Sequence, residues 1–295
     1  MDYHKIQLKS KSKISEETLL YKILYRTHRL VLRLFYGEYG IYRLKFLVEK
    51  FFRIKGIENQ KYNEIRKIEN LHKGKRCFIV ATGPSLRIED VEKLNGEITF
   101  GMNSLVSIFD KTDWRPTYYV VQDCSVWDRN KKMYFKEEKI KFLIGENVAR
   151  YDRSANGKPN SIIYPLDLHN HDCVDNKDRS NPKRPKFSND AYKGIEDGYT
   201  VTYSVIQLAV YMGFSEIYLL GVDCNYSGPT SHIGVEKGDN SLMNDLKRIG
   251  PEAQMLCSYA VARENLDALN VKIYNATRGG KMDVFDRVNF DEIQF

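Results

Sequence analysis

After position 76, short runs of β-branched or aromatic residues alternate with stretches that have helical apolar spacing. The runs predict strands near residues 77–81, 98–102, 117–122, 140–144, 161–164, 216–221 and 271–275. The intervening stretches predict helices near residues 88–94, 104–109, 199–212 and 251–269. This alternation is typical of an α/β fold with a mostly parallel sheet and helices on both faces.

Before position 76 the pattern is helical instead. Residues 14–56 have the spacing of two amphipathic helices, interrupted at 36–40, and residues 57–75 form a polar helix or linker. Lys and Arg interleave with Leu and Phe, as in a helix lying on anionic lipid. A helical hairpin packed on the main domain, with a solvated basic face, explains the same pattern. We therefore predict a basic helical extension over 1–75 and a catalytic domain over 76–295.

Residues 168–197 form a long polar stretch within this domain, with two prolines. A structureless loop of that length is uncommon in a compact domain unless it has a function. We interpret it as a lid-like insertion over a site, and a disordered insertion is the alternative.

Charge divides the chain in the same place. Residues 1–76 hold 19 Lys+Arg and 8 Asp+Glu, a net +11, whereas the whole chain is +7 and the remainder is therefore −4. Confinement of the basic charge to one segment, without a recognisable nucleic-acid module, argues against a nucleic-acid partner. Five scattered cysteines favour reduced thiols, and no apolar run is long enough for a membrane span. We expect a cytoplasmic protein that is peripheral on the inner membrane face.

Small, polar or acidic residues follow six of the predicted strands, at the edge where ligands of open α/β sheets bind. The first of these ends is Thr82-Gly83-Pro84-Ser85, placed between a strand and a helix. Gly83 permits close backbone approach, and Pro84 suits the first turn of a helix whose N–H groups face an anion. A phosphate cradle and a plain tight turn are both consistent with this pattern, which matches neither common nucleotide-binding fingerprint.

Five stretches in a fixed order form a more specific pattern: "VATGPSL", "FGMNS", "YYVVQDCSV", "TVTYSVIQLAVYMGFSEIYLLGVD" and "YNATRGG". Together they resemble the 6-hydroxymethylpterin pyrophosphokinase-like domain family, which is shared with motility-associated flagellin glycosyltransferases. They are more distantly similar to the bacterial CMP-sialic acid transferases. The resemblance covers about residues 74–290. It implies a Rossmann-like nucleotide-binding fold, no required metal, and a histidine general base.

The resemblance also implies site residues. His232, in a loop nine residues after Asp223, best matches the catalytic histidine, and we take His232 and Asp223 as the candidate catalytic residues. An exposed loop histidine is the alternative. Thr82 replaces an asparagine of the sialyltransferase motif, and Asp123 replaces another, where an acid would repel phosphate unless it bound ribose or a metal. The candidate nucleotide-binding residues are Thr82, Gly83, Pro84, Ser85, Asn103, Asp123, Ser125, Thr200, Thr202 and Gly221.

These residues predict a glycosyltransferase that uses a nucleotide-activated sugar, with a CMP-linked acidic sugar as one candidate donor. Its acceptor would be a glycan or lipid-linked glycan in bacterial cell-surface polysaccharide or glycoconjugate assembly. No cofactor is required in this interpretation. In the alternative, Asp123 and Asp223 follow neighbouring strands and hold Mg²⁺ for an ATP pyrophosphokinase with a pterin-like substrate. A non-catalytic nucleotide- or glycan-binding protein is the third hypothesis.

Overall fold

A parallel sheet forms the centre of the computed structural model, which describes residues 40–57, 60–169, 182–225 and 252–295. Its eight strands within these ranges are ordered β10-β9-β8-β1-β2-β3-β4-β5, and every pairing is parallel. The strands are β1 (Arg76–Val80), β2 (Thr99–Met102), β3 (Tyr118–Val121), β4 (Lys141–Gly145), β5 (Ser161–Tyr164), β8 (Glu216–Leu220), β9 (Lys272–Asn275) and β10 (Asp286–Arg287). A second, two-stranded sheet pairs β6 (Leu166–Asp167) with β7 (Ile195–Glu196).

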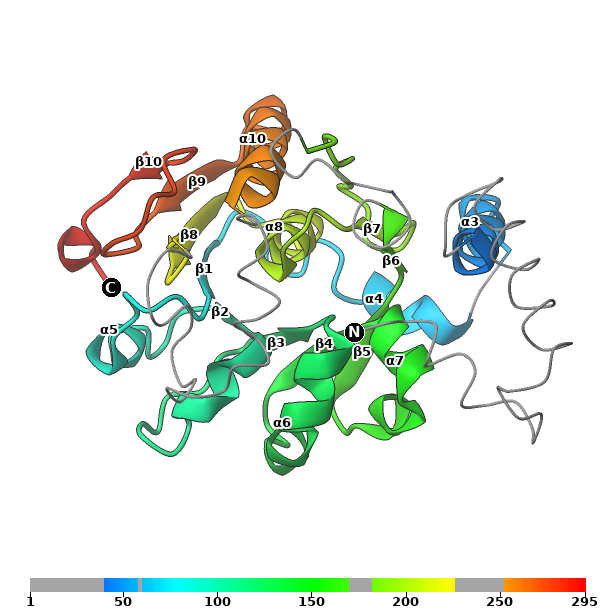
Figure 1. Ribbon diagram of the computed structural model, residues 1–295, viewed down its shortest axis with the longest axis horizontal. Helices are drawn as coiled ribbons and strands as arrows, with labels where there is room; N and C mark the ends of the chain where they lie inside the picture. The colour runs from blue at the N-terminus through cyan, green and yellow to red at the C-terminus, as the bar shows by residue number, and fades with distance from the viewer. Residues whose placement is uncertain (1–39, 58–59, 170–181, 226–251) are drawn as a thin grey trace, which may run out of the picture.

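Helices cover both faces of the large sheet, as the sequence predicts. Figure 1 shows α8 and α10 on one face and α5, α6 and α7 on the other. The α-helices are α3 (Gly40–Ile54), α4 (Asn63–Arg66), α5 (Ile88–Glu92), α6 (Cys124–Lys136), α7 (Glu146–Tyr151), α8 (Val201–Tyr211) and α10 (Glu252–Ala268). Short 3₁₀ helices are η1 (Gln60–Tyr62), η2 (Asn103–Ile108), η3 (Arg153–Gly157) and η5 (Phe290–Glu292).

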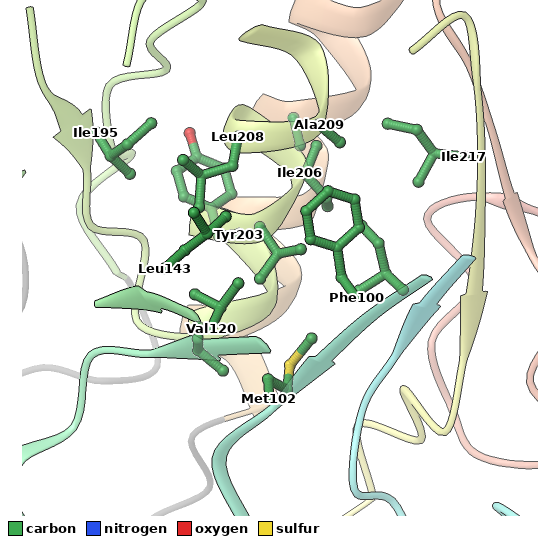
Figure 2. Packing of buried hydrophobic residues seen from close by; sticks show 14 of the residues in the cluster. Phe100, Met102, Val120, Leu143, Ile195, Tyr203, Ile206, Leu208, Ala209 and Ile217 are labelled. Atoms are coloured by element: carbon green, nitrogen blue, oxygen red, sulfur yellow. The ribbon is translucent and has the colours of Figure 1, made fainter. Parts of the chain in front are cut away.

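The central strands are buried on both sides, which explains their uninterrupted apolar runs. In β1, Cys77 and Ile79 belong to the core under α8, whereas Phe78 and Val80 belong to the core under α5 and η2. Figure 2 shows how the first core is filled, with side chains of α8 lying over those of β2 and β3. Burial of this apolar surface is the main favourable contribution to folding.

The order of the strands places a topological switch point between β1 and β8. From β1 the chain continues through β2 to β5 on one side, and β8, β9 and β10 then lie on the other side of β1. Loops that leave β1 and β8 diverge to opposite faces, so a crevice for ligands is expected beyond their carboxyl ends. The end of β1 is directly paired with the end of β8, with Val80 opposite Leu220.

Seven predicted strands are confirmed, with ends that differ by about one residue. The prediction did not include α6, α7, the small sheet or β10. Residues 57–75, expected to be a polar helix or linker, include the short helix α4, but they are not a linker because Tyr62, Ile65 and Ile68 are buried in the core. Residues 182–197 are not structureless, because Ile195 is completely buried and β7 pairs with β6, whereas their lid-like role stays a prediction. Residues 170–181 lie outside the described residues.

Of the two predicted N-terminal helices, the second is confirmed as α3 and the first lies outside the described residues. None of the helices in the described ranges combines the length and the apolar content needed to cross a membrane.

Candidate functional site

Asp223 lies where three loops meet at the switch point. It follows β8, and its side-chain Oδ2 accepts hydrogen bonds from the Ser85 hydroxyl at 2.9 Å and the Ser85 backbone N–H at 3.4 Å, both in the loop after β1. The loop after β9 is joined to it by the Lys281 N–H, which donates to the Asp223 carbonyl at 2.7 Å. Asp223, Ser85, Gly83, Thr82 and Gly221 therefore lie close together, as the sequence analysis expected of residues at one edge of the sheet.

Glycines make this approach possible. A Cβ on Gly83 would lie 1.8 Å from Asp223 Oδ2, and a Cβ on Gly280 would lie 2.2 Å from the Asp223 carbonyl oxygen. Gly221 has a φ of +65°. The chain at the end of the neighbouring strand β1 lies so close that a Cβ on Gly221 would be 2.8 Å from the Ala81 carbonyl oxygen. The sequence therefore needs glycine here to bring a carboxylate against two other loops.

Burial raises the pKa of Asp223, and the hydrogen bonds from Ser85 oppose that effect. No described residue donates a hydrogen bond to Oδ1, which lies toward Gly279. A desolvated carboxylate with an available oxygen is a good acceptor for a ligand hydroxyl, and its raised pKa improves it as a base.

Of the two interpretations of residues 82–85, the structure supports the tight turn and not the phosphate cradle. Gly83-Pro84-Ser85-Leu86 is a turn closed by a hydrogen bond from the Leu86 N–H to the Gly83 carbonyl, and α5 begins only at Ile88. The N–H of Gly83 donates to Gly221, and that of Ser85 donates to Asp223. Pro84 has no N–H to offer. These amides therefore join the loops after β1 and β8, and they do not form an open anion site at a helix N-terminus.

Asn103 follows β2, the next strand along the edge, and has a left-handed backbone with φ +49°. Its carbonyl accepts hydrogen bonds from the hydroxyls of Tyr119 at 2.6 Å and Tyr134 at 2.7 Å. Both tyrosines are fully buried, and Tyr119 also accepts from the Val106 N–H at 2.8 Å. The Asn103 Oδ1 is buried without a hydrogen-bond partner among the described residues. The two phenols therefore hold Asn103 in a conformation that few non-glycine residues adopt.

Asp123 has a structural role that accounts for its position. Its Oδ1 accepts from the N–H groups of Ser125 at 2.7 Å and Val126 at 2.9 Å, so it is the N-cap of α6. The expectation that Asp123 and Asp223 follow neighbouring strands is wrong, because β1 and β2 lie between β3 and β8. At about 4.8 Å per strand, the two carboxylates are too far apart to share one cation. The residues present do not fit a magnesium site built on this pair.

No group of three or more metal-ligating side chains occurs within the described ranges. Thr200 is the N-cap of α8 and accepts from the Thr202 N–H at 3.4 Å. Thr202 is buried, and its hydroxyl contacts the Met102 sulfur at 3.6 Å, so α8 supports the end of β2 through this residue. His232 lies outside the described residues.

Sequence reasoning missed three contributors to this edge. Gly280 could be recognised in the sequence as part of a Gly-Gly pair after a predicted strand. Its close approach to Asp223 could not be predicted from the sequence. Tyr119 and Tyr134 carry no local signal, because a tyrosine within a strand or helix usually packs in the core. Their convergence on Asn103 depends on how β3 and α6 pack against η2.

Comparison with protein families identifies the class. Residues 55–229 match the family described as 6-hydroxymethylpterin diphosphokinase MptE-like. Because this stretch is more than half of the chain, the chain belongs to that family. The match begins at residue 55, so it includes η1 and α4, which the sequence analysis placed in the extension. No curated protein matches the sequence.

One solved structure shows the same fold. The MAf glycosyltransferase from Magnetospirillum magneticum AMB-1 superposes with a TM-score of 0.50 at 12% identity, over 77% of this chain and 36% of that chain. The chain therefore spans about a third of that protein. The Campylobacter jejuni sialyltransferase CstII in complex with cytidine-5'-monophosphate gives a TM-score of 0.46 at 14% identity, over 76% of this chain and 88% of that chain. At 12% identity, the likeness to the MAf glycosyltransferase concerns the fold alone.

Proposed function

We propose that this protein is a glycosyltransferase that uses a nucleotide-activated sugar. The observation that carries the proposal is the convergence of Ser85 and the desolvated Asp223 carboxylate at the switch point of the sheet. The fold shared with the MAf glycosyltransferase supports it. The "TGPSL" and "GMNS" stretches favour a CMP-linked acidic sugar as the first donor to test.

The proposed reaction is a direct displacement. The acceptor hydroxyl oxygen forms a bond to the anomeric carbon, the bond from that carbon to the donor phosphate breaks, and the nucleotide leaves with the electron pair. His232 is the proposed base that takes the acceptor proton. Asp223 accepts a hydrogen bond from a sugar or ribose hydroxyl, Ser85 orients Asp223, and Asn103 contacts the nucleotide. The other residues proposed to line the nucleotide site are Thr82, Gly83, Pro84, Ser125, Thr200 and Gly221. Thr202 is proposed to contribute indirectly, by supporting β2.

The acceptor in this proposal is a glycan or lipid-linked glycan, in assembly of a cell-surface polysaccharide or glycoconjugate. An enzyme with such an acceptor works at a membrane surface. We therefore keep a peripheral location on the inner face of the membrane, with contact through residues 14–56, as part of the proposal.

The alternative is the activity for which the family is named, a diphosphokinase. The separation of Asp123 from Asp223 by two strands, and the use of Asp123 as a helix cap, oppose a magnesium site between them. A pyrophosphokinase would therefore need a metal ligand set other than the one the sequence suggested.

The test is a thermal-shift panel with CMP, CDP, UDP, GDP and ATP, each with and without Mg²⁺. A ligand at 100 times its Kd adds about 2.7 kcal/mol of stability and should raise the melting temperature by roughly 4–6 °C for a domain of this size. A shift with CMP or CDP that is independent of Mg²⁺ supports the transferase. An ATP shift that requires Mg²⁺ overturns it in favour of the diphosphokinase. A shift without turnover of any donor supports a non-catalytic binding protein.

A matched pair of variants sharpens the panel. Asp123→Asn retains the cap and should leave ligand-induced shifts unchanged, because asparagine is an equally good N-cap. Asp223→Asn should abolish the shift. If both variants lost the ligand-induced shift equally, both aspartates would act in ligand binding, which would contradict a purely structural role for Asp123.

A further inference from the structure

Helix α3 contacts the rest of the protein through a face that is partly polar. The Tyr42 hydroxyl donates to the Leu166 carbonyl at 2.8 Å, and Phe46 is completely buried. Arg53 is 3% exposed and donates to the Lys193 carbonyl at 3.0 Å. Figure 1 shows α3 at the rim of the molecule, beside β6 and β7.

Charged side chains of α3 also point toward the domain. Lys50 forms an ion pair with Glu196 at 3.2 Å, and Glu49 accepts from Arg150 at 3.3 Å. The expectation that the basic side chains of this helix face lipid is therefore wrong for Lys50 and Arg53. Their charges are used in holding α3 against the small sheet.

The opposite face of α3 is apolar and exposed. Six large hydrophobic side chains on this segment are 43% to 55% exposed, and they are six of the ten such side chains among the described residues. We call them the α3 apolar face: Leu44, Val48, Phe51, Phe52, Ile54 and Ile57. The helix is thus amphipathic with its apolar side outward, which is the reverse of an ordinary surface helix.

Cations border this face. Lys45 is exposed, with 60% of its side chain accessible, and the Lys55 ammonium lies 5.8 Å from the centre of the Phe51 ring. The single carboxylate between residues 40 and 57 is Glu49, which pairs with Arg150 at 3.3 Å on the domain side and more loosely with Lys45 at 3.8 Å. Residues 1–39 add eight Lys+Arg and four Asp+Glu, a net +4. Aromatic rings flanked by lysines, with net positive charge nearby, match the chemistry of an anionic lipid interface.

We propose that the α3 apolar face inserts into the headgroup region of an anionic membrane. The helix lies in the plane of the interface, its Phe and Ile side chains enter the acyl boundary, and Lys45 and Lys55 reach anionic headgroups. The ion pairs on the other face transmit this orientation to the small sheet and so to the whole domain. The inference deepens the proposed location at a membrane, but it does not depend on the proposed activity.

Charge favours lipid as the partner of the α3 apolar face over a second copy of the protein or the N-terminal segment of the same chain. A second copy would bring like-charged lysines and the basic residues 1–39 together, which opposes association. Cover by residues 14–36 of the same chain would also place cations beside Lys45 and Lys55. An anionic bilayer neutralises all of these charges and removes the apolar side chains from water in one contact.

The experiment is vesicle sedimentation of the full-length chain, with phosphatidylcholine alone or with about one third phosphatidylglycerol. Wild type should bind the anionic vesicles and be released by high salt only in part, because apolar contact persists when charges are screened. The double variant Phe51→Ser/Phe52→Ser should bind about tenfold more weakly. Leu71→Ser is the control, because Leu71 is equally exposed elsewhere and its loss should change nothing.

Three results would overturn the inference. Wild type that stays in solution with anionic vesicles would refute a lipid contact. Unchanged binding by the double Phe variant, with an unchanged melting temperature, would assign binding to the basic segment 1–39 alone. A concentration-dependent dimer without lipid, lost in that variant, would assign the face to a second copy. Nucleotide-induced thermal shifts are measured separately, so vesicle binding without nucleotide binding would overturn the proposed function and leave this inference standing.

Discussion

The Ser85 hydroxyl donates a 2.9 Å hydrogen bond to Asp223, a residue 138 positions away in the chain, and this bond joins the loops that follow two neighbouring strands. The contact crosses the switch point of the sheet, where ligands of this architecture bind. Burial raises the pKa of the Asp223 carboxyl, so ionised Asp223 destabilises the fold. A carboxylate retained at a destabilising position on a binding edge is typical of a functional residue.

Asp223→Asn should therefore stabilise the folded protein at pH 7 while it abolishes the nucleotide-induced thermal shift. Because the folded-state pKa is raised, the destabilisation is complete above that pKa and disappears below the unfolded-state pKa of about 3.9. The stability difference between variant and wild type should shrink as the pH falls from 7 toward 4. Urea denaturation across that range measures it. A variant less stable than wild type at pH 7 would contradict the assignment.

Gly83 supplies the second prediction. In Gly83→Ala the new methyl group would lie 1.8 Å from Asp223 Oδ2 and 2.4 Å from the Gly221 carbonyl, so the loops after β1 and β8 must separate. We expect a loss of at least about 2 kcal/mol in the free energy of unfolding. Gly157→Ala is the control, because nothing lies within 4 Å of its Cβ and its φ is ordinary. It should be within about 0.5 kcal/mol of wild type. Equal stability of both variants would refute this account of Gly83.

Local pattern was sufficient for the strands and for the edge at which the polar residues gather. Runs such as Cys77–Ala81 are apolar throughout because both faces of a central parallel strand are buried. The role of Pro84 was left open because proline suits both the first helical turn and the second position of a β-turn. The choice between a helical turn and a β-turn depends on the loop after β8. There the Gly221 carbonyl accepts from the Gly83 N–H, and the Asp223 side chain accepts from the Ser85 N–H.

Strand order was beyond the reach of local pattern. Asp123 and Asp223 each follow a strand, and only the tertiary pairing shows that two strands separate them. Helix α6 was missed for a different reason: its sequence is mostly polar, although its apolar residues share one face and Asp123 caps its start. The contact of two tyrosines with Asn103 likewise needs the packed structure.

The two tyrosines that contact Asn103 are expected to contribute unequally to the stability of the fold. Tyr134→Phe removes one of two hydrogen bonds to the Asn103 carbonyl, for a loss of about 1 kcal/mol in stability. Tyr119→Phe also leaves the buried Val106 N–H without its acceptor, so it should be the more destabilising by about 1 kcal/mol. Chemical denaturation of both variants checks the order.

The double tyrosine variant tests whether the pair acts on Asn103 together. It leaves the Asn103 carbonyl without either phenol, so its destabilisation should exceed the sum of the single losses. Its nucleotide-induced thermal shift should be smaller than that of either single variant, because the Asn103 side chain is no longer held at the edge. Additive stabilities with an unchanged shift would mean that the tyrosines only pack the core.

Glu146 provides a prediction away from the binding edge. Its side chain is completely buried, and Oε1 accepts from Lys61 at 2.7 Å and from Arg150 at 2.6 Å. Burial alone would raise the pKa of Glu146, but the attraction of Lys61 and Arg150 is stronger and lowers it. Because the folded-state pKa is lowered, the ionised side chain stabilises the fold above its unfolded-state pKa, and this contribution is lost as the pH falls through the folded-state pKa.

Glu146→Gln should therefore destabilise the protein at pH 7 by about 2–3 kcal/mol, at the low end for a buried pair because Lys61 is 35% exposed and reaches water. The difference from wild type should diminish below about pH 4, as Glu146 itself becomes protonated. Glu64→Gln removes the same charge from an exposed pair with Lys67 and should leave stability unchanged. If denaturation at pH 7 ranks the two variants equally, the ion cluster does not hold η1 against α7.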